Sequence, residues 1–361
     1  MGWGYRDTFF VAILLILTTI SSSLDSPPTS FNRDGKKEKF SETGEEIKWL
    51  YEEWLVLHDK SYNEPSERDH RFEIFKKNLH LIDEHNRLKN TSSYTLGLNQ
   101  FSDLTYKEFA SHYLNIYTNT TEQFIFSDSD RYMYKDGEIL PDFVDWRSRG
   151  AVGLVKDQGR CKCCWAFSAI AAIEGVNQIT TGEFVTLSEQ QILDCEMTNT
   201  GCCKTGYVNY AYEFVIMNGG IDTDTSYPYH GKKKKCKWNG ETVVGITNYE
   251  FIPRYSERSL QKAVANQPIS VVIRTHCIAF QFYKSGIFNG PCGKKLRHAM
   301  VVVGFGNENG EDYWIVKNSW GDKWGENGYI RMKRNVDKPA GVCGITTYAS
   351  YPLMTYSSLS N

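Results

Sequence analysis

The sequence lacks two features that are typical of nucleic-acid-binding or membrane proteins. It has no excess of charge of one sign, since 41 basic and 43 acidic residues leave a formal net charge of −2. A broad basic surface for nucleic acid or anionic lipid is therefore not expected. It also has no apolar run that could cross a bilayer, because the run at residues 9–20 is too short and no later run is long enough. We expect neither nucleic acid nor a membrane as a partner.

The N-terminus is typical of a cleaved secretory signal peptide. Arg6 precedes the apolar run FFVAILLILTTI, and the small polar residues Ser21 to Ser23 follow it. We therefore assign residues 1–24 to a signal peptide and expect the chain to enter the secretory pathway, with an extracellular, vacuolar or lysosome-like destination. Because that pathway is oxidising, the ten Cys become candidates for disulfides.

The most informative stretch, residues 158–182, reads QGRCKCCWAFSAIAAIEGVNQITTG. Apolar residues at Ala166, Ile170 and Ile173 predict a buried helix that begins at Cys164 and is closed by Gly182. A thiol in the first turn of a helix lies near free backbone N–H groups and the positive end of the helix dipole. Both favour the thiolate, which is the nucleophilic form of cysteine.

This stretch resembles the nucleophile segment of papain-like cysteine proteases, which have a His and an Asn far downstream. Here RHAMVVVGFG supplies His298 and YWIVKNSWGDKWGENGY supplies Asn318, in the order of that family. The resemblance implies a cysteine endopeptidase in which Cys164 attacks the peptide carbonyl and His298 stabilises the thiolate, then protonates the leaving amine. Asn318 would orient His298. Gln158 and the backbone N–H of Cys164 would bind the oxyanion. No cofactor or metal is expected.

Residues 25–137 resemble the inhibitory propeptide of the same family. Two helical patterns are followed by GLNQFSD, whose alternation predicts one face of a strand over residues 97–103. The spacing within the second helical pattern matches the propeptide signature at Glu67, Arg71, Phe75, Asn78, Ile82 and Asn86. Asp103 is a candidate pH-sensitive element, since protonating a paired carboxylate weakens a fold; the alternative is that it caps a turn before Leu104. A polar linker over about residues 111–137 would be open to cleavage.

The rest of the chain predicts an α+β protease with a helical half followed by a β half. Residues 138–250 carry the helix that begins at Cys164 and a further helix that starts at Ser188, with Gln191 as its capping-box partner. Residues 251–361 are rich in β-branched and aromatic runs. The resemblance implies the papain-like two-domain fold, a helical domain and an antiparallel β-barrel with the active-site cleft between them.

The resemblance also implies disulfide pairings. Cys161 would pair with Cys203 or, as the alternative, with Cys202. The two further bridges of the family correspond to the pairs Cys195–Cys236 and Cys292–Cys343. We expect Cys163 to form a fourth bridge with the spare cysteine of the 202–203 pair, and Cys277 to stay free.

The chain departs from the family beside the pocket for the residue just before the cut. Lys162 and Cys163 stand where the family usually has Gly and Ser, and Lys204 and Thr205 precede Gly206 where it usually has a small polar residue and a Gly. Lys and Thr side chains would narrow that pocket and add positive charge, so we expect a preference for small or acidic residues there. Gly206 would bind substrate backbone.

The next pocket has an apolar lining, which implies a hydrophobic residue two positions before the cut. Its residues, by resemblance, are Tyr207, Val208, Val272, Leu296, Ala299 and Tyr348, and Tyr348 would shorten its floor. Trp320 would cover the contact between His298 and Asn318 and exclude water. Arg297 would disfavour the imidazolium if its side chain points inward, or would have no such effect if it points to solvent.

Two alternatives compete with the protease hypothesis. The first is a papain-fold protein that binds or stores without cutting. The second is a zinc site, which could be built from Cys161, Cys163, Cys202 and Cys203. As partners we expect protein and peptide substrates, the chain's own propeptide as an inhibitor and cystatin-type inhibitors, with the enzyme as a monomer. Asn90 and Asn119 lie in acceptor tripeptides for N-glycosylation.

Overall fold

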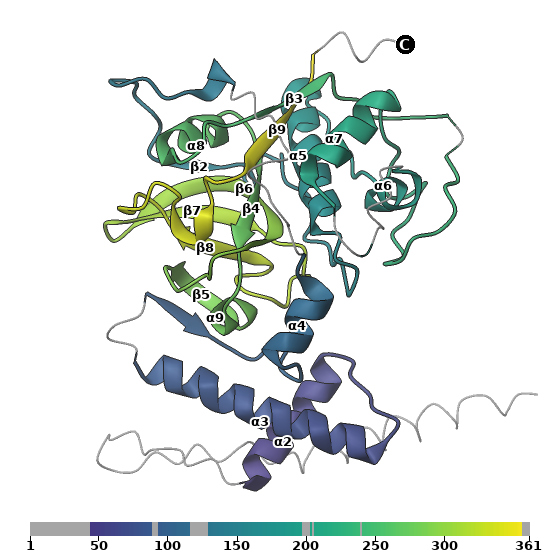
Figure 1. The fold of residues 1–361 in the computed structure, drawn as a ribbon, viewed down its shortest axis with the longest axis vertical. Coiled ribbons are helices and arrows are strands. Elements are labelled where there is room, and N and C mark those ends of the chain that lie inside the picture. Colours follow the sequence, from purple (N-terminus) through teal and green to yellow (C-terminus); the bar gives the residue numbers. More distant parts are fainter. Residues whose placement is uncertain are drawn as a thin grey trace, which may run out of the picture. The chain divides into compact units, whose positions relative to one another are not determined.

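The computed structural model describes residues 44–88, 93–115, 129–196, 203, 206–238 and 240–355 (Figure 1). The predicted signal peptide, both glycosylation sites at Asn90 and Asn119, and the loop residues Cys202, Lys204 and Thr205 lie outside this part of the chain. The chain divides into two units after Ile47, and the fold below is that of the second unit. Within the described ranges, no helix has the length and apolar character needed to cross a membrane.

Helices dominate the region that resembles a propeptide: α2 (Gly44–Leu57), α3 (Pro65–Arg87) and α4 (Tyr106–Tyr113). The core between α2 and α3 is aromatic. The fully buried ring of Phe75 lies 5.1 Å from the ring of Tyr51 and 5.4 Å from that of Trp54, measured between centroids. Because α3 places residues three or four apart on one face, the predicted signature spacing brings Phe75 into this core.

A turn, rather than the predicted strand, occupies residues 99–104. The strand β1 spans only Tyr94–Leu96. After it, the Asn99 side chain accepts a hydrogen bond from the N–H of Phe101 (2.9 Å), and the N–H of Ser102 donates to the Asn99 carbonyl (3.1 Å). An Asn side chain that bonds its own backbone two residues on favours a turn over an extended chain. Asn78 of α3 stabilises this turn by donating to the Ser102 carbonyl (2.9 Å).

The region that resembles a propeptide also adds a strand to the sheet. β1 pairs antiparallel with β5 (Tyr283–Phe288), and Tyr94 stands opposite Gly286. Gly286 has a φ of +93°, and a Cβ at this position would lie 2.4 Å from the Ser93 carbonyl oxygen. Only glycine fits here, because φ is in the left-handed region and the propeptide backbone fills the space of a side chain.

The helical half of the protease region is built around α5 (Cys164–Thr181), which begins at Cys164 as predicted. Its C-cap is Gly182 with a φ of 82°, the left-handed conformation that ends many helices. Two shorter helices, α6 (Glu189–Cys195) and α7 (Val208–Met217), follow. The Ser188 side chain accepts a hydrogen bond from the N–H of Gln191 and so provides the predicted N-cap of α6.

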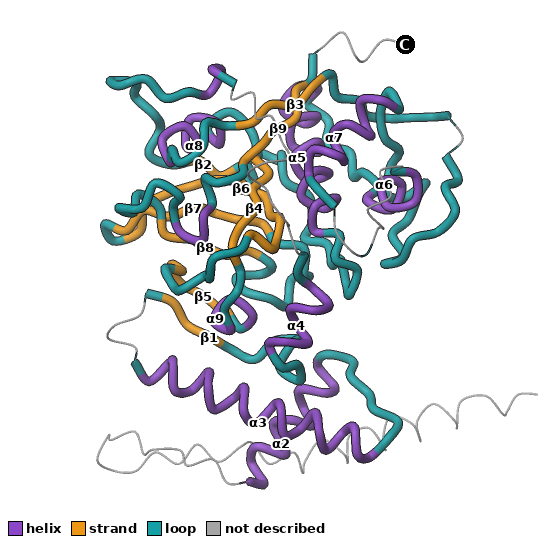
Figure 2. Tube along the Cα trace, viewed as in Figure 1, coloured by secondary structure: helices purple, strands orange, loops and turns teal. Residues whose placement is uncertain are grey.

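The β half forms a sheet in the order β1-β5-β8-β7-β6-β4-β9-β3, and β2 also pairs with β6 (Figure 2). Its further elements are β2 (Val144–Asp145), β3 (Asn248–Phe251), α8 (Glu257–Val264), β4 (Ile269–Arg274), α9 (Ile278–Gln281), β6 (Leu296–Glu308), β7 (Glu311–Lys317), β8 (Tyr329–Lys333) and β9 (Ala349–Leu353). Short 3₁₀ helices lie at Asp130–Tyr132 and Val342–Gly344.

The predicted antiparallel β-barrel takes the form of an open sheet that includes one parallel pairing. The strand order has two ends, at β1 and β3, so the sheet is not closed. The pairing of β5 with β8 is parallel and covers only two positions, Ile287 with Arg331 and Phe288 with Met332. Since β5 meets β8 only near its end, the rest of β5 is left as an edge, and the propeptide strand pairs with it.

Two large apolar cores lie in the described part of the second unit. One includes the fully buried Trp314 and Val302 of the β half and also Phe101 and Phe109 of the region that resembles a propeptide. The other surrounds α5 but also contains Val272, Ala299 and Tyr348 from the β half. Because this second core is continuous across both halves, it fixes the start of α5 against β4 and β6.

We predict that Phe75→Ala destabilises the propeptide by about 3–5 kcal/mol, the usual cost of truncating a fully buried Phe. The measurement is urea unfolding of the full-length Cys164→Ala precursor, which cannot cleave itself if Cys164 is the nucleophile. Leu57→Ala is the matched control on α2, because Leu57 is 63% exposed and should change stability by no more than about 0.5 kcal/mol. Equal effects of the two substitutions would contradict the described core.

Candidate active site

The thiol of Cys164 lies where the two halves meet. Cys164 is the first residue of α5 and is fully buried. Its sulfur accepts a hydrogen bond from the backbone N–H of Ala299 on β6, with a distance of 3.4 Å between nitrogen and sulfur. Since Ala299 directly follows His298, this contact brings the predicted nucleophile beside the strand that carries the predicted base.

His298 is held by Asn318, which directly follows β7. The distance between Nε2 of His298 and Oδ1 of Asn318 is 2.6 Å. The same Oδ1 accepts from the N–H of Ser319 (2.8 Å), so the amide oxygen faces the ring and Nε2 carries a proton. Nδ1 is then the basic nitrogen, and it has no hydrogen-bond partner in the described residues. The Trp320 ring stacks on His298 with centroids 4.4 Å apart, as expected of a cover for this contact.

Burial sets the protonation of His298 in this form of the protein. The ring is fully buried, and loss of solvation lowers the pKa of His298 to about 4, against an opposing effect of the hydrogen bond to Asn318. The causes of this shift do not include Arg297.

Gln158 lies in the loop before α5 and is anchored to Ser319. Its side-chain oxygen accepts from the Ser319 hydroxyl (2.7 Å), and its backbone N–H donates to the Ser319 carbonyl (2.9 Å). The side-chain nitrogen then donates to the carbonyls of Cys161 (3.1 Å) and Tyr113 (3.2 Å). A carbonyl from another segment of the chain is therefore bound by the amide that was predicted to bind an oxyanion.

The propeptide fills this site. Tyr113, which accepts the Gln158 bond, is the last residue of α4. Two residues later, the Asn115 N–H donates to the Arg297 carbonyl (2.7 Å), and its side-chain nitrogen lies 3.8 Å from the Cys164 sulfur. Phe109 packs edge-on against Trp320 at 5.2 Å. The backbone and side chains after α4 thus occupy the position in which a substrate would have to bind.

Asp103 lies away from these groups, within the propeptide. Its carboxylate is buried, lies 3.5 Å from the Lys60 nitrogen and accepts a hydrogen bond from the Tyr62 hydroxyl. The turn at Leu104 is closed by a backbone hydrogen bond to Phe101 rather than by this carboxylate. Of the two roles considered, the contacts match the paired carboxylate.

The residues predicted to bind substrate lie together around the start of α5. The six apolar ones share the second core with Cys164: Tyr207, Val208, Val272, Leu296, Ala299 and Tyr348. The Tyr348 hydroxyl donates to Oδ1 of Asn209 (2.8 Å), which fixes the ring in place. Gly206 must lack a side chain, because a Cβ there would lie 2.1 Å from the Trp165 ring. Lys162 is half-buried.

Three disulfides have the predicted pairings: Cys161–Cys203, Cys195–Cys236 and Cys292–Cys343. The first removes two of the four thiols that the zinc alternative requires. The predicted fourth bridge is wrong, because Cys163 is a free thiol, as is Cys277. The Cys163 sulfur instead lies 3.1 Å from the Tyr229 hydroxyl. That partner is far away in the sequence, so spacing could not identify it.

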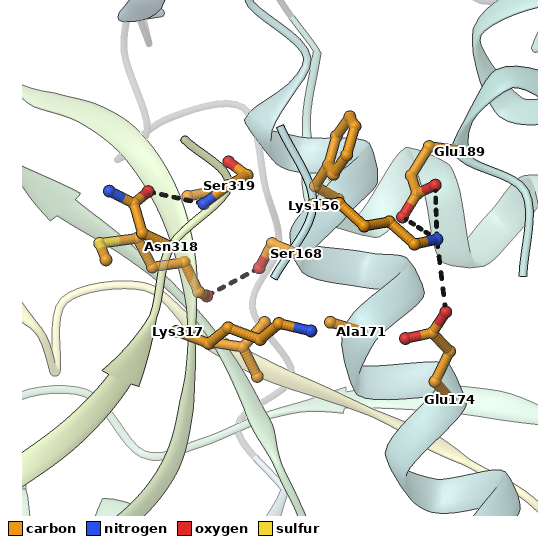
Figure 3. Close-up of a pocket in the computed structure, with 12 residues that line it drawn as sticks. Lys156, Ser168, Ala171, Glu174, Glu189, Lys317, Asn318 and Ser319 are labelled. Atoms are coloured by element: carbon orange, nitrogen blue, oxygen red, sulfur yellow. Dashed lines mark hydrogen bonds and ion pairs between the residues drawn. The ribbon is translucent and has the colours of Figure 1, made fainter. Parts of the chain in front are cut away.

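A buried ionic cluster lies beside Asn318 and Ser319 (Figure 3). Lys156 pairs with Glu189 of α6 (2.9 Å) and Glu174 of α5 (3.6 Å), and Lys317 of β7 donates to the Gly153 carbonyl (3.0 Å). The cavity beside them has a volume of about 20 Å³, room for one water, and Asn318 and Ser319 line it. Burial raises the pKa of Glu189 to about 7, although Lys156 opposes the shift. Sequence reasoning missed this cluster and Ser319, although Ser319 follows Asn318 directly.

Comparisons with known proteins agree with this geometry. Residues 140–353 match the model described as papain family cysteine protease, and residues 51–109 match the cathepsin propeptide inhibitor domain. A probable cysteine protease of Arabidopsis thaliana, RDL2, is 50% identical over 313 residues, 85% of each chain. The cysteine proteinase RD21A of the same plant is 48% identical over 97% of this chain and 76% of its own. The recombinant stem bromelain precursor superimposes with a TM-score of 0.79 at 43% identity, covering 85% of this chain and 99% of its own.

We predict that acid destabilises the precursor partly through His298. Because burial lowers the pKa of His298 from 6.5 to about 4, the unfolded chain binds a proton between these values that the folded precursor excludes. The contribution to stability is therefore fully present above pH 6.5 and is lost as the pH falls toward 4. The measurement is the difference in unfolding free energy between Cys164→Ala and Cys164→Ala/His298→Gln across this window. A difference that does not vary with pH would contradict the assignment.

Proposed function

Because the chain belongs to the papain family of cysteine proteases and carries its own inhibitory propeptide, we propose that it hydrolyses peptide bonds with the sulfur of Cys164 as nucleophile. His298 acts as the base and acid, Asn318 orients His298, and Gln158 binds the oxyanion. The observation that carries this proposal is the convergence of the two halves: the Cys164 sulfur touches the N–H of Ala299, while the neighbouring His298 is held by Asn318.

The proposed reaction begins when the propeptide leaves and solvent reaches His298. Its pKa then rises, Nδ1 takes the proton of the Cys164 thiol, and the thiolate is stabilised by the imidazolium and the start of α5. The thiolate attacks the carbonyl carbon, and the negative charge on the oxygen is bound by the Gln158 amide and the backbone N–H of Cys164. The imidazolium protonates the leaving amine. Water, deprotonated by the same imidazole, then hydrolyses the thioester.

Inhibition and localisation extend this proposal. The Tyr113 carbonyl uses the Gln158 nitrogen that an oxyanion would need, so the enzyme stays inactive until residues 111–137 are cut and the propeptide dissociates. Acid would favour that step through His298, whose pKa is lowered by burial in the precursor. We assign the protein to the secretory pathway on the basis of residues 1–24 and the disulfides, with an extracellular, vacuolar or lysosome-like destination.

The proposal predicts a graded loss of activity in four variants. Cys164→Ala should abolish peptide hydrolysis, and His298→Ala should abolish both hydrolysis and labelling of Cys164 by a thiol-directed epoxide peptide. Asn318→Ala should retain labelling at a reduced rate. Gln158→Ala should lower kcat by roughly 10²- to 10³-fold, the usual cost of losing one oxyanion donor.

Labelling followed by measurement of kcat on the matured protein tests this series. A protein that folds but neither reacts with the epoxide nor hydrolyses peptides would instead be the non-proteolytic binding protein. The Cys277→Ser variant is the control, since Cys277 is a free thiol outside the site and its loss should leave both readouts unchanged.

Substrate preference is predicted at two positions. A hydrophobic residue is preferred two positions before the cut. Tyr348→Ser should deepen that pocket and raise kcat/KM for substrates with Phe there relative to Val. The reason is that burying each further CH₂ is favourable by about 0.8 kcal/mol. Directly before the cut, Lys162 and Thr205 favour small or acidic residues. A panel of peptides that vary only at these positions measures both. Fastest cleavage after Arg would contradict the second preference, and an unchanged Phe-to-Val ratio in Tyr348→Ser would contradict the first.

A further inference from the structure

The loop of residues 158–164, here called the oxyanion loop, carries both groups of the proposed oxyanion site. On the side of the β half, Ser319 fixes its first residue through the two hydrogen bonds to Gln158 already described. On the opposite side, a disulfide joins Cys161 to Cys203. A loop that must hold two donors in a fixed relation needs bracing along its whole length, because small displacements of catalytic groups cost large factors in rate.

Tyr229 supplies a third contact that holds this loop. Its hydroxyl donates to the backbone carbonyl of Gln158 at 2.7 Å. Its ring packs edge-on against the ring of Phe167 on α5, with centroids 5.0 Å apart. Tyr229 therefore connects the residue that would bind the oxyanion to the helix that would carry the nucleophile, without lying in the predicted substrate path.

Cys163 completes the connection. It is the N-cap of α5 and is fully buried. Its sulfur lies 3.1 Å from the Tyr229 hydroxyl oxygen and 3.2 Å from the Cys161 carbonyl oxygen. Burial raises the pKa of this thiol well above its ordinary value, so it remains a neutral S–H donor. Because the Tyr229 proton is used on Gln158, the Cys163 proton is available to the Tyr229 oxygen or to Cys161.

We infer that Tyr229 and Cys163 act as a pair of positioning residues for the oxyanion site. Through Tyr229 and Cys163, the first residue of the oxyanion loop is fixed to the residue before the nucleophile, so the Gln158 amide and the Cys164 N–H keep one mutual geometry. This inference rests on the proposed function. It also gives Cys163 a role as a thiol that is not a nucleophile, a metal ligand or a disulfide partner.

The test uses isosteric changes in the full-length chain, which is then allowed to mature. Tyr229→Phe removes one hydroxyl and should lower kcat for peptide hydrolysis about tenfold or more, with KM within about twofold. Tyr227→Phe is the matched control. Tyr227 lies two positions before Tyr229 in the sequence, and its hydroxyl donates to Asp194 (3.0 Å) instead of to the oxyanion loop. The kcat of this variant should stay within about twofold of that of the unmodified protein.

Cys163 is tested by conservative rescue. Cys163→Ser keeps a donor and an acceptor and should retain kcat, whereas Cys163→Ala removes both and should lose activity as Tyr229→Phe does. The double variant Tyr229→Phe/Cys163→Ala should lose little more than either single variant, since residues in one hydrogen-bonded unit are not additive.

Epoxide labelling separates positioning from general damage. Alkylation of Cys164 builds no negative charge on a carbonyl oxygen, so the labelling rate of Tyr229→Phe should match that of the unmodified protein while peptide turnover falls. An equal fall in both rates would overturn the inference, as would a kcat within twofold in Tyr229→Phe or an equal loss in Tyr227→Phe. Absence of turnover in the unmodified protein would be a distinct result, and it would overturn the proposed function together with this inference.

Discussion

The meeting of α5 with β6 is the constraint on which the rest of the structure depends. The nucleophile candidate and its base candidate belong to different halves of the chain, and neither half alone could bring them together. The core around α5 solves this problem because it draws Val272, Ala299 and Tyr348 from strands into the same packing as Cys164. The buried cluster of Lys156, Glu174 and Glu189 joins helices behind the site, and Lys317 extends it to β7.

Burial has two effects on His298 in the precursor: it keeps the ring neutral, and it leaves the ring's orientation unchanged. In the precursor, His298 is fully buried and its pKa is lowered, and a neutral imidazole is a poor partner for a thiolate. The same enclosure keeps Nε2 bonded to Asn318 and the ring stacked on Trp320, so the base is already oriented before activation. Burial therefore keeps His298 neutral while its hydrogen bond to Asn318 and its stacking on Trp320 stay in place.

The sequence predicted correctly those features that depend on residues close together in the chain, such as helix ends and caps. The helix that starts at Cys164 and ends at Gly182 followed from apolar spacing and a terminal glycine, and the N-cap at Ser188 followed from its side chain. The strand expected over residues 97–103 was wrong because the Asn99 side chain bonds its own backbone. The β-rich half was predicted too, but its strand order and the two ends of its sheet depend on pairing between distant segments, which local signals do not encode. The partner of Cys163 could not be predicted either, since Tyr229 reaches it only through the tertiary fold.

Gly286 is restricted by a contact that exists in the precursor and is absent after the propeptide has been removed. Gly286 lies in the protease region, but the place that its side chain would take is occupied by the backbone of Ser93, which belongs to the propeptide. Once that segment is gone, the steric restriction disappears, whereas a φ of +93° still favours glycine. One position of the protease region is thus restricted in part by a contact that exists only in the precursor, so the chain carries a constraint that its cleaved form no longer uses.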